Sequence, residues 1–130
     1  MTEIRGQKTE NREMGYRRLK AWIKCDELAK ALYKASAKFP KEETYALTAQ
    51  IRRASLSAPT NIVEGYARKG KKEFRHFLSI SLASLAETGY LLEFARSQGY
   101  LSEDDFKKLD SLRDECSRIV WGLLESQTVR

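Results

Sequence analysis

Apolar residues recur every three to four positions along four stretches of this chain, and glycine or proline stands between one stretch and the next. That spacing places apolar side chains on one face of an α-helix. No stretch alternates β-branched and polar residues, the pattern typical of a half-buried strand. The periodicity predicts four helices, at about residues 19–37, from 40 to a stop between residues 65 and 70, at 71–97 and at 102–126.

Residues at the ends of these stretches support the predicted boundaries. Pro40 suits a first helical position, and the turn after it is acidic, with Glu43 in a place that the helix dipole favours. Gly99 is well placed to end the third helix, and Ser102 to cap the fourth. Pro59 falls inside the second stretch, where we expect it to bend the helix without ending it.

A chain of 130 residues is long enough for one domain with a buried core. Because the connections between the predicted helices are short, consecutive helices should run antiparallel. We therefore expect an all-α fold, an up-down antiparallel four-helix bundle over residues 19–126. Residues 1–18 are polar and mixed in charge, which predicts a flexible basic arm.

The composition excludes several kinds of protein. Two cysteines, Cys25 and Cys116, are too few for a disulfide-stapled secreted domain or a four-cysteine zinc site, and both fall on apolar stripes, as buried thiols would. No run approaches the roughly 18 apolar residues of a membrane span. The first 20 residues lack the apolar segment of a signal peptide. We expect a cytoplasmic protein that does not enter a membrane.

Glu73 and His76 have the Glu-x-x-His spacing that di-iron bundles use. Such a site needs two of these motifs and two further glutamates, and this chain has one histidine. The preferred interpretation is a partly exposed histidine in basic surroundings. Neither a metal nor an organic cofactor is expected.

The net charge of +6 favours anionic partners. Residues 68–76 concentrate five basic side chains and one acid at the junction between the second and third predicted helices. A solvated loop is the plain interpretation, but the helix dipole disfavours cations at a helix N-terminus, so local stability does not explain the run. We interpret it as an anion-binding surface. Phosphate contacts are predicted for Arg52, Arg53, Arg68, Lys69, Lys71, Lys72 and Arg75.

Aromatic residues accompany the basic run. Phe74 and Phe77 follow the apolar periodicity and are expected in the core, which leaves Tyr66 as the candidate for stacking on an unpaired base.

Four polar residues lie close to the apolar stripes: Asn61, Glu64, Ser84 and Glu87. Buried polar groups need partners, so we expect a structural network in which Asn61 pairs with Glu64, and Ser84 with Glu87. The alternative, an acid/base pair formed by the two glutamates, lacks a nucleophile, a metal or an oxyanion site beside it. The chain is therefore not expected to be an enzyme.

The third predicted helix is apolar on more than one side, through Ile80, Leu82, Leu91 and Phe94. We expect one bundle to leave part of this surface uncovered, which predicts a homo-oligomer. Gly89, in the interior of the same helix, is expected to allow the close approach of a neighbouring helix.

Several segments together resemble the four-helix bundle proteins encoded in intervening sequences of bacterial 23S rRNA genes. The resemblance covers about residues 19–125, and Asn61-Ile62-Val63-Glu64-Gly65 is its most specific part. The other segments that carry it are Phe39 to Leu47, Gln50 to Ala54, Arg68, Glu73-Phe74, Phe77-Leu78, Ile80, Ser84, Glu87 and Gly99-Tyr100-Leu101. Ala58 and Thr88-Gly89 depart from the family pattern.

This resemblance implies an up-down bundle that assembles as a ring-shaped homopentamer. Accessory variability proteins of diversity-generating retroelements are similar, and these are basic pentamers that bind nucleic acid and associate with a reverse transcriptase. We therefore expect a non-enzymatic bundle that binds nucleic acid, RNA ahead of DNA, by charge and shape. The alternative is a protein-interaction scaffold, an accessory subunit of a retroelement reverse transcriptase.

Overall fold

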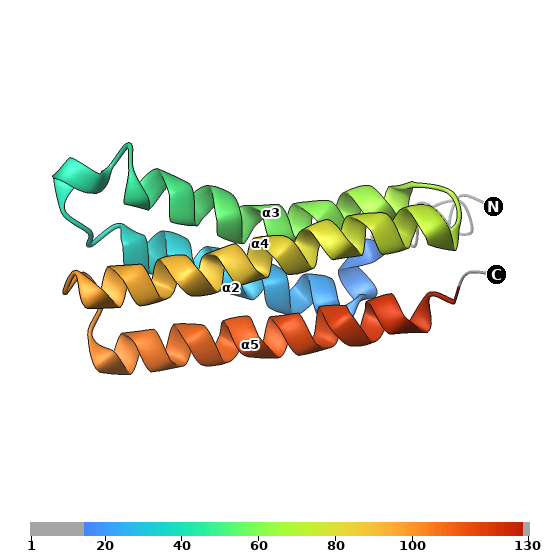
Figure 1. The fold of residues 1–130 in the computed structure, drawn as a ribbon. Helices are drawn as coiled ribbons and strands as arrows, with labels where there is room; N and C mark the ends of the chain where they lie inside the picture. The colour runs from blue at the N-terminus through green and yellow to red at the C-terminus, as the bar shows by residue number, and fades with distance from the viewer. Residues whose placement is uncertain (1–14, 129–130) are drawn as a thin grey trace, which may run out of the picture.

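The structure is a computed structural model that describes residues 15–128. Four long helices make up most of it (Figure 1). The elements in chain order are η1 (Tyr16–Arg18), α2 (Lys20–Ser36), η2 (Lys41–Glu43), α3 (Leu47–Ala67), α4 (Lys71–Ser97) and α5 (Glu103–Ser126), where η marks a 3₁₀ turn. No β-strand occurs within the described residues. The prediction of an all-α fold with four helices is confirmed.

The four helices lie side by side and close into one bundle (Figure 1). α3 packs against α2 and α4, and α5 packs against α4 and α2. The start of α2, the turn between α3 and α4 and the end of α5 lie together at one end of the bundle (Figure 1). We call this end, which comprises residues 15–22, 64–76 and 120–128, the turn end. The opposite end carries η2 and the α4–α5 turn.

Leucine, isoleucine and valine from all four helices form the core. The largest fully buried apolar side chains are Leu28, Leu32, Ile51, Ile62, Leu78, Leu85, Leu92 and Val120. Cys25 and Cys116 are free thiols buried in this core, as expected. Their mutual hydrogen bond and their burial raise the pKa of the Cys25 thiol, so it stays protonated.

The second helix begins later than predicted. Lys41–Glu43 form the turn η2, the chain bends at Ala46 (φ −113°, ψ −104°), and α3 starts at Leu47. The side chain of Glu43 accounts for this start, since Oε1 accepts the Leu47 N–H at 3.3 Å and Oε2 accepts the Tyr100 hydroxyl at 3.0 Å. The acidic turn thus precedes α3 instead of forming its first turn. α3 then continues through Pro59 to Ala67.

The remaining boundaries agree with the sequence. α4 spans Lys71–Ser97, and Gly99 turns the chain away from it. The φ of Gly99, 79°, lets the Tyr100 N–H reach the Ala95 carbonyl at 2.9 Å. Ser102 caps α5, because its Oγ accepts the Asp105 N–H at 3.1 Å.

Residues 15–18, the last part of the predicted arm, lie against the bundle. Tyr16 packs edge-on against Trp22 at 5.2 Å, and a Cβ on Gly15 would come within 2.8 Å of the Tyr66 ring. η1 contacts both α2 and α3. The rest of the predicted arm, residues 1–14, lies outside the described residues.

The apolar surplus expected on α4 is present in part. Ile80 and Phe94 are 36% and 40% exposed, Leu82 is half-buried, and Leu91 is buried at 4%. Gly89 does face a neighbouring helix, since a Cβ there would lie 2.9 Å from Nε of Arg113 on α5. None of the helices over residues 15–128 is long and apolar enough to span a membrane.

Candidate nucleic-acid interface

Three lysines project from the α3–α4 turn. Lys69, Lys71 and Lys72 are exposed, and none of them forms an ion pair with another described residue. The turn is tight because Gly70 adopts φ 89°, a conformation that favours glycine. These residues, which we call the turn-end lysines, present three cations to solvent within one turn.

Two arginines of the predicted interface have their charges directed at the protein itself. Arg75 is half-buried, and its NH1 donates to the carbonyls of Leu124 at 2.8 Å and Gln127 at 3.1 Å, at the C-terminal end of α5. Arg52 donates through NH2 to the Tyr33 carbonyl at 3.0 Å, near the end of α2. Cations suit these carbonyl ends of helices, so both arginines cap a helix of the bundle.

Arg68 and Arg53 differ from this pair. Arg68 lies 2.8 Å from a Glu64 carboxylate oxygen and 5.2 Å over the Phe77 ring, so its charge is largely satisfied within the turn. Arg53 is exposed, but it lies about 15 residues before the turn along α3, or roughly 22 Å at a rise of 1.5 Å per residue. The predicted cations therefore do not form one surface.

Two further cations, which the sequence predicts in the basic arm, lie at the turn end. η1 places Arg17 and Arg18, both exposed, at the same end of the bundle as the turn-end lysines. The Arg17 guanidinium lies 5.0 Å over the Tyr16 ring. The basic character of this segment was visible in the sequence, but its place in the fold depends on the contact between Gly15 and Tyr66.

A small hollow of about 260 Å³ opens beside the turn-end lysines. We call it the turn-end hollow, and its lining residues are Gly65, Tyr66, Arg68, Gly70, Lys71, Phe74 and Gln127. The rings of Tyr66 and Phe74 stand perpendicular, at 84° with centroids 6.3 Å apart. Tyr66 is 42% exposed, as expected, whereas Phe74 is half-buried against the core.

The predicted polar network is present with different members. Ser57 on α3 and Ser84 on α4 share a hydrogen bond of 2.7 Å, and Asn61 Nδ2 donates to Ser57 Oγ at 3.0 Å. Glu64 and Glu87 are exposed and lie outside it, so the expected pairings of Asn61 with Glu64 and of Ser84 with Glu87 are wrong. Ser57 lies one helical turn before Asn61, and that spacing is the signal that would have found it.

His76 is exposed and packs edge-on against Phe77 with ring centroids 5.3 Å apart. Over the part of the chain that the structure describes, no three His, Cys, Asp or Glu side chains are grouped closely enough to hold a metal ion.

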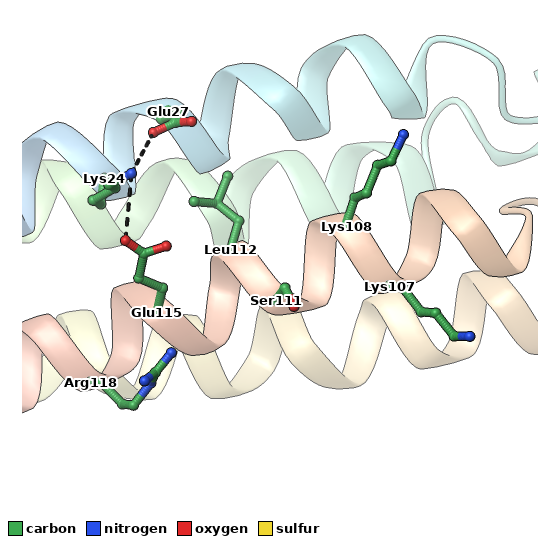
Figure 2. Close-up of a pocket in the computed structure, with 8 residues that line it drawn as sticks. All are labelled: Lys24, Glu27, Lys107, Lys108, Ser111, Leu112, Glu115 and Arg118. Carbon is green, nitrogen blue, oxygen red and sulfur yellow. Dashed lines mark ion pairs between the residues drawn. The ribbon is translucent and has the colours of Figure 1, made fainter.

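A second basic region lies between α2 and α5, where the sequence analysis predicted none. Figure 2 shows this α2–α5 groove, an open depression of about 650 Å³. Its lining residues are Lys24, Glu27, Lys107, Lys108, Ser111, Leu112, Glu115 and Arg118. The cations come from two helices that are distant in the sequence, which is why no run of basic residues marks the groove.

Carboxylates share the walls of this groove with the cations. Lys24 Nζ bridges the two helices, 3.5 Å from a carboxylate oxygen of Glu27 and 3.5 Å from one of Glu115 (Figure 2). Glu115 and Glu27 raise the pKa of Lys24 above its usual value of 10.5. Arg118 pairs with Asp114 at 3.1 Å. Ion pairs thus engage two of the four cations that line the groove.

The fold matches that of a solved structure. A crystal structure at 1.70 Å of a protein of unknown function from the S23 ribosomal protein family of Bacteroides thetaiotaomicron superposes with a TM-score of 0.75. The two sequences are 21% identical, and the match covers 81% of this chain and 95% of that chain. At this identity the likeness concerns the fold alone.

A comparison with curated proteins gives no match. The profile of the 23S rRNA-intervening sequence protein family matches residues 17–122, from η1 through most of α5. This match spans well over half of the chain, and it includes the Asn61-to-Gly65 segment and the α3–α4 turn that follows it. The chain therefore belongs to the 23S rRNA-intervening sequence protein family.

Proposed function

We propose that this protein is a non-enzymatic, cytoplasmic nucleic-acid-binding protein that contacts phosphates with its turn end. The observation that carries the proposal is the set of turn-end lysines, Lys69, Lys71 and Lys72, which are exposed and without ion pairs among the described residues. Arg17 and Arg18 extend the same basic end. The family name concerns an intervening sequence of 23S rRNA, which makes RNA the first nucleic acid to test.

Binding at this surface is electrostatic. Lysine ammonium groups on a tight turn neutralise phosphates and release condensed counterions, so affinity falls as salt rises. Lysines that reach phosphates carry no direct sequence readout. The protein therefore binds unrelated RNA sequences with similar affinity.

The test is a triple variant, Lys69→Gln, Lys71→Gln and Lys72→Gln, assayed by fluorescence anisotropy on two unrelated RNAs and one duplex DNA over a series of salt concentrations. The logarithm of affinity should fall linearly with the logarithm of salt for the parent. Loss of three phosphate contacts should flatten that slope by about 3 for a duplex and by about 2 for a single strand. Folding should change little, because exposed charges contribute little stability.

The matched control removes the same charge away from the turn end, with Lys34→Gln, Lys107→Gln and Lys108→Gln. All three of these lysines are exposed, and Lys107 and Lys108 line the α2–α5 groove. The control should keep most of the parent slope. Equal slopes for the parent and the turn-end variant would contradict the proposal.

We further propose that the protein acts as a homo-oligomer, a pentamer by analogy with the proteins that its sequence resembles. Exposed apolar side chains on the outer stripe of α4 support association, namely Ile80, Tyr90 and Phe94. Light scattering coupled to size exclusion at micromolar protein should give a mass about five times the 15.0 kDa of one chain. A stable mass near 15.0 kDa would contradict this.

The second candidate is a protein-interaction scaffold, an accessory subunit that docks a reverse transcriptase. An apolar hollow of about 460 Å³ between α2 and α3, lined in part by Ala29, Tyr33 and Leu56, favours it as a place for a partner. Genomic position separates the two candidates. A gene within a 23S rRNA insert supports the first, and a neighbouring reverse transcriptase with a template repeat supports the second.

A further inference from the structure

We propose that the turn-end hollow receives one unpaired nucleobase of a bound RNA, stacked on Tyr66. This inference rests on the proposed function and adds to it the kind of RNA that the turn end prefers. The two aromatic walls of the hollow, its size and the cations around it support this inference.

The walls of the hollow suit a flat ring. Tyr66 and Phe74 stand at 84° to each other, so they form a corner in which a base stacks on one ring and meets the other edge-on. The corner is rigid because Gly65 brings the helices together. A Cβ on Gly65 would lie 2.7 Å from the Phe77 Cβ and 3.0 Å from the Phe74 ring.

The size of the hollow limits what it holds. Its volume of about 260 Å³ lies below the roughly 300–1,000 Å³ of pockets that enclose drug-sized ligands. One base fits such a volume. Gln127 also lines the hollow, and its backbone carbonyl accepts a hydrogen bond from Arg75 NH1 at 3.1 Å.

The cations around the hollow favour a polymer over a small free ligand. Lys71 stands in the lining, Lys69 and Lys72 flank it, and η1 places Arg17 and Arg18 at the same end of the bundle. A free nucleobase would not use these charges. The backbone of an RNA strand would use them on both sides of an inserted base.

The first measurement uses the whole chain and a fluorescent base. An RNA hairpin carries 2-aminopurine as a single bulged nucleotide, and a matched hairpin carries it paired. Binding should quench the bulged probe, because stacking on an aromatic ring quenches 2-aminopurine, and should leave the paired probe unchanged. The protein should also bind the bulged hairpin about tenfold more tightly, the effect of stacking one base.

The second measurement uses variants of Tyr66. Tyr66→Leu should remove the preference for the bulged hairpin and its quenching, while Tyr66→Phe, which keeps the ring, should retain both. Tyr45→Leu is the control, since Tyr45 is 94% exposed near the opposite end of the bundle. If Tyr66→Leu does not fold, the comparison of bulged and paired probes on the parent protein still decides whether one unpaired base is bound.

The outcomes separate this inference from the proposed function. Equal affinity for both hairpins without quenching overturns the base-binding inference and leaves phosphate binding standing. Quenching that Tyr66→Leu retains would place the base elsewhere and also overturn it. A parent protein that binds neither hairpin at low salt overturns both proposals.

Discussion

The turn end and the α2–α5 groove are both rich in cations, but they differ in what surrounds the charges. At the turn end, Lys69, Lys71 and Lys72 are free of ion pairs within residues 15–128, and the hollow beside them has no carboxylate in its lining. In the groove, Glu27 and Glu115 line the walls and hold Lys24 between them. An approaching phosphate meets attraction at the first site and mixed charge at the second.

The difference teaches that a count of basic residues does not identify an anion-binding surface. A basic side chain that already pairs with a carboxylate or with a helix carbonyl of the protein is less available to an external anion. Arg75 is an example within the turn end, because its guanidinium donates hydrogen bonds to the Leu124 and Gln127 carbonyls. The following predictions test whether structural and free cations are separable in this way.

The largest effect on stability is expected from Arg75→Met. This variant leaves two carbonyls at the end of α5 without their charged donor, which should lower the free energy of unfolding by about 2–3 kcal/mol. Urea denaturation at matched protein concentration measures it. Lys72→Met is the control and should change stability by less than about 0.5 kcal/mol. Equal stability for both variants, with equal losses of RNA affinity, would show that Arg75 acts as a phosphate contact.

A smaller effect is expected from Gly65→Ala at the α3–α4 contact. The new Cβ would stand 2.7 Å from the Phe77 Cβ, and such overpacking costs about 1–3 kcal/mol, less up to about 1 kcal/mol gained in helix propensity. Thermal unfolding should show a net loss. Gly122→Ala on α5 is the control of opposite sign, because nothing lies within 4 Å of its Cβ position. A stabilised Gly65→Ala variant would mean that the turn end is not held by this contact.

These contacts also explain how far the sequence could predict the fold. Helix boundaries that depend on neighbouring residues, such as Gly99 and Ser102, are found correctly, because their hydrogen bonds close within five residues. The start of α3 depends instead on Glu43, whose second partner, Tyr100, lies 57 positions away. Local patterns carry no information about that contact, so the predicted start at Pro40 is early.

The same reasoning separates the predictable from the unpredictable part of the candidate site. Exposure of the turn-end lysines follows from a local run around Gly70. The partners of Arg75 lie 49 and 52 positions away, and the α2–α5 groove joins Lys24 to Glu115 across most of the chain. A basic residue whose partner is that distant looks the same in the sequence as one that faces solvent.

Removing the carboxylates of the groove should reduce the difference in RNA attraction between the groove and the turn end. Glu27→Gln with Glu115→Gln frees Lys24 and removes two negative charges from the walls. RNA affinity at low salt should rise about three- to fivefold, on the order of 1 kcal/mol. Glu87→Gln with Glu93→Gln, both exposed on α4 away from the groove and the turn end, is the control for net charge alone. Equal gains for both variants would mean that only total charge matters and that the two regions do not differ.

The smallest effect concerns alkaline pH and the bridge at Lys24. Glu115 and Glu27 raise the pKa of Lys24 above 10.5, so the folded state binds this proton more tightly than the unfolded chain does. The contribution of Lys24 to stability is therefore complete below pH 10.5 and disappears as the pH rises beyond it. Lys24→Met should make the protein less stable than the parent at pH 9, and the difference should shrink towards pH 11.5.

Other lysines and tyrosines also titrate over this range, so the quantity to measure is the difference in unfolding temperature between variant and parent at each pH. Lys34→Met, an exposed lysine on the same helix, provides the control. A difference for Lys24→Met that stays constant across this range would show that the bridge between α2 and α5 contributes through packing and not through charge.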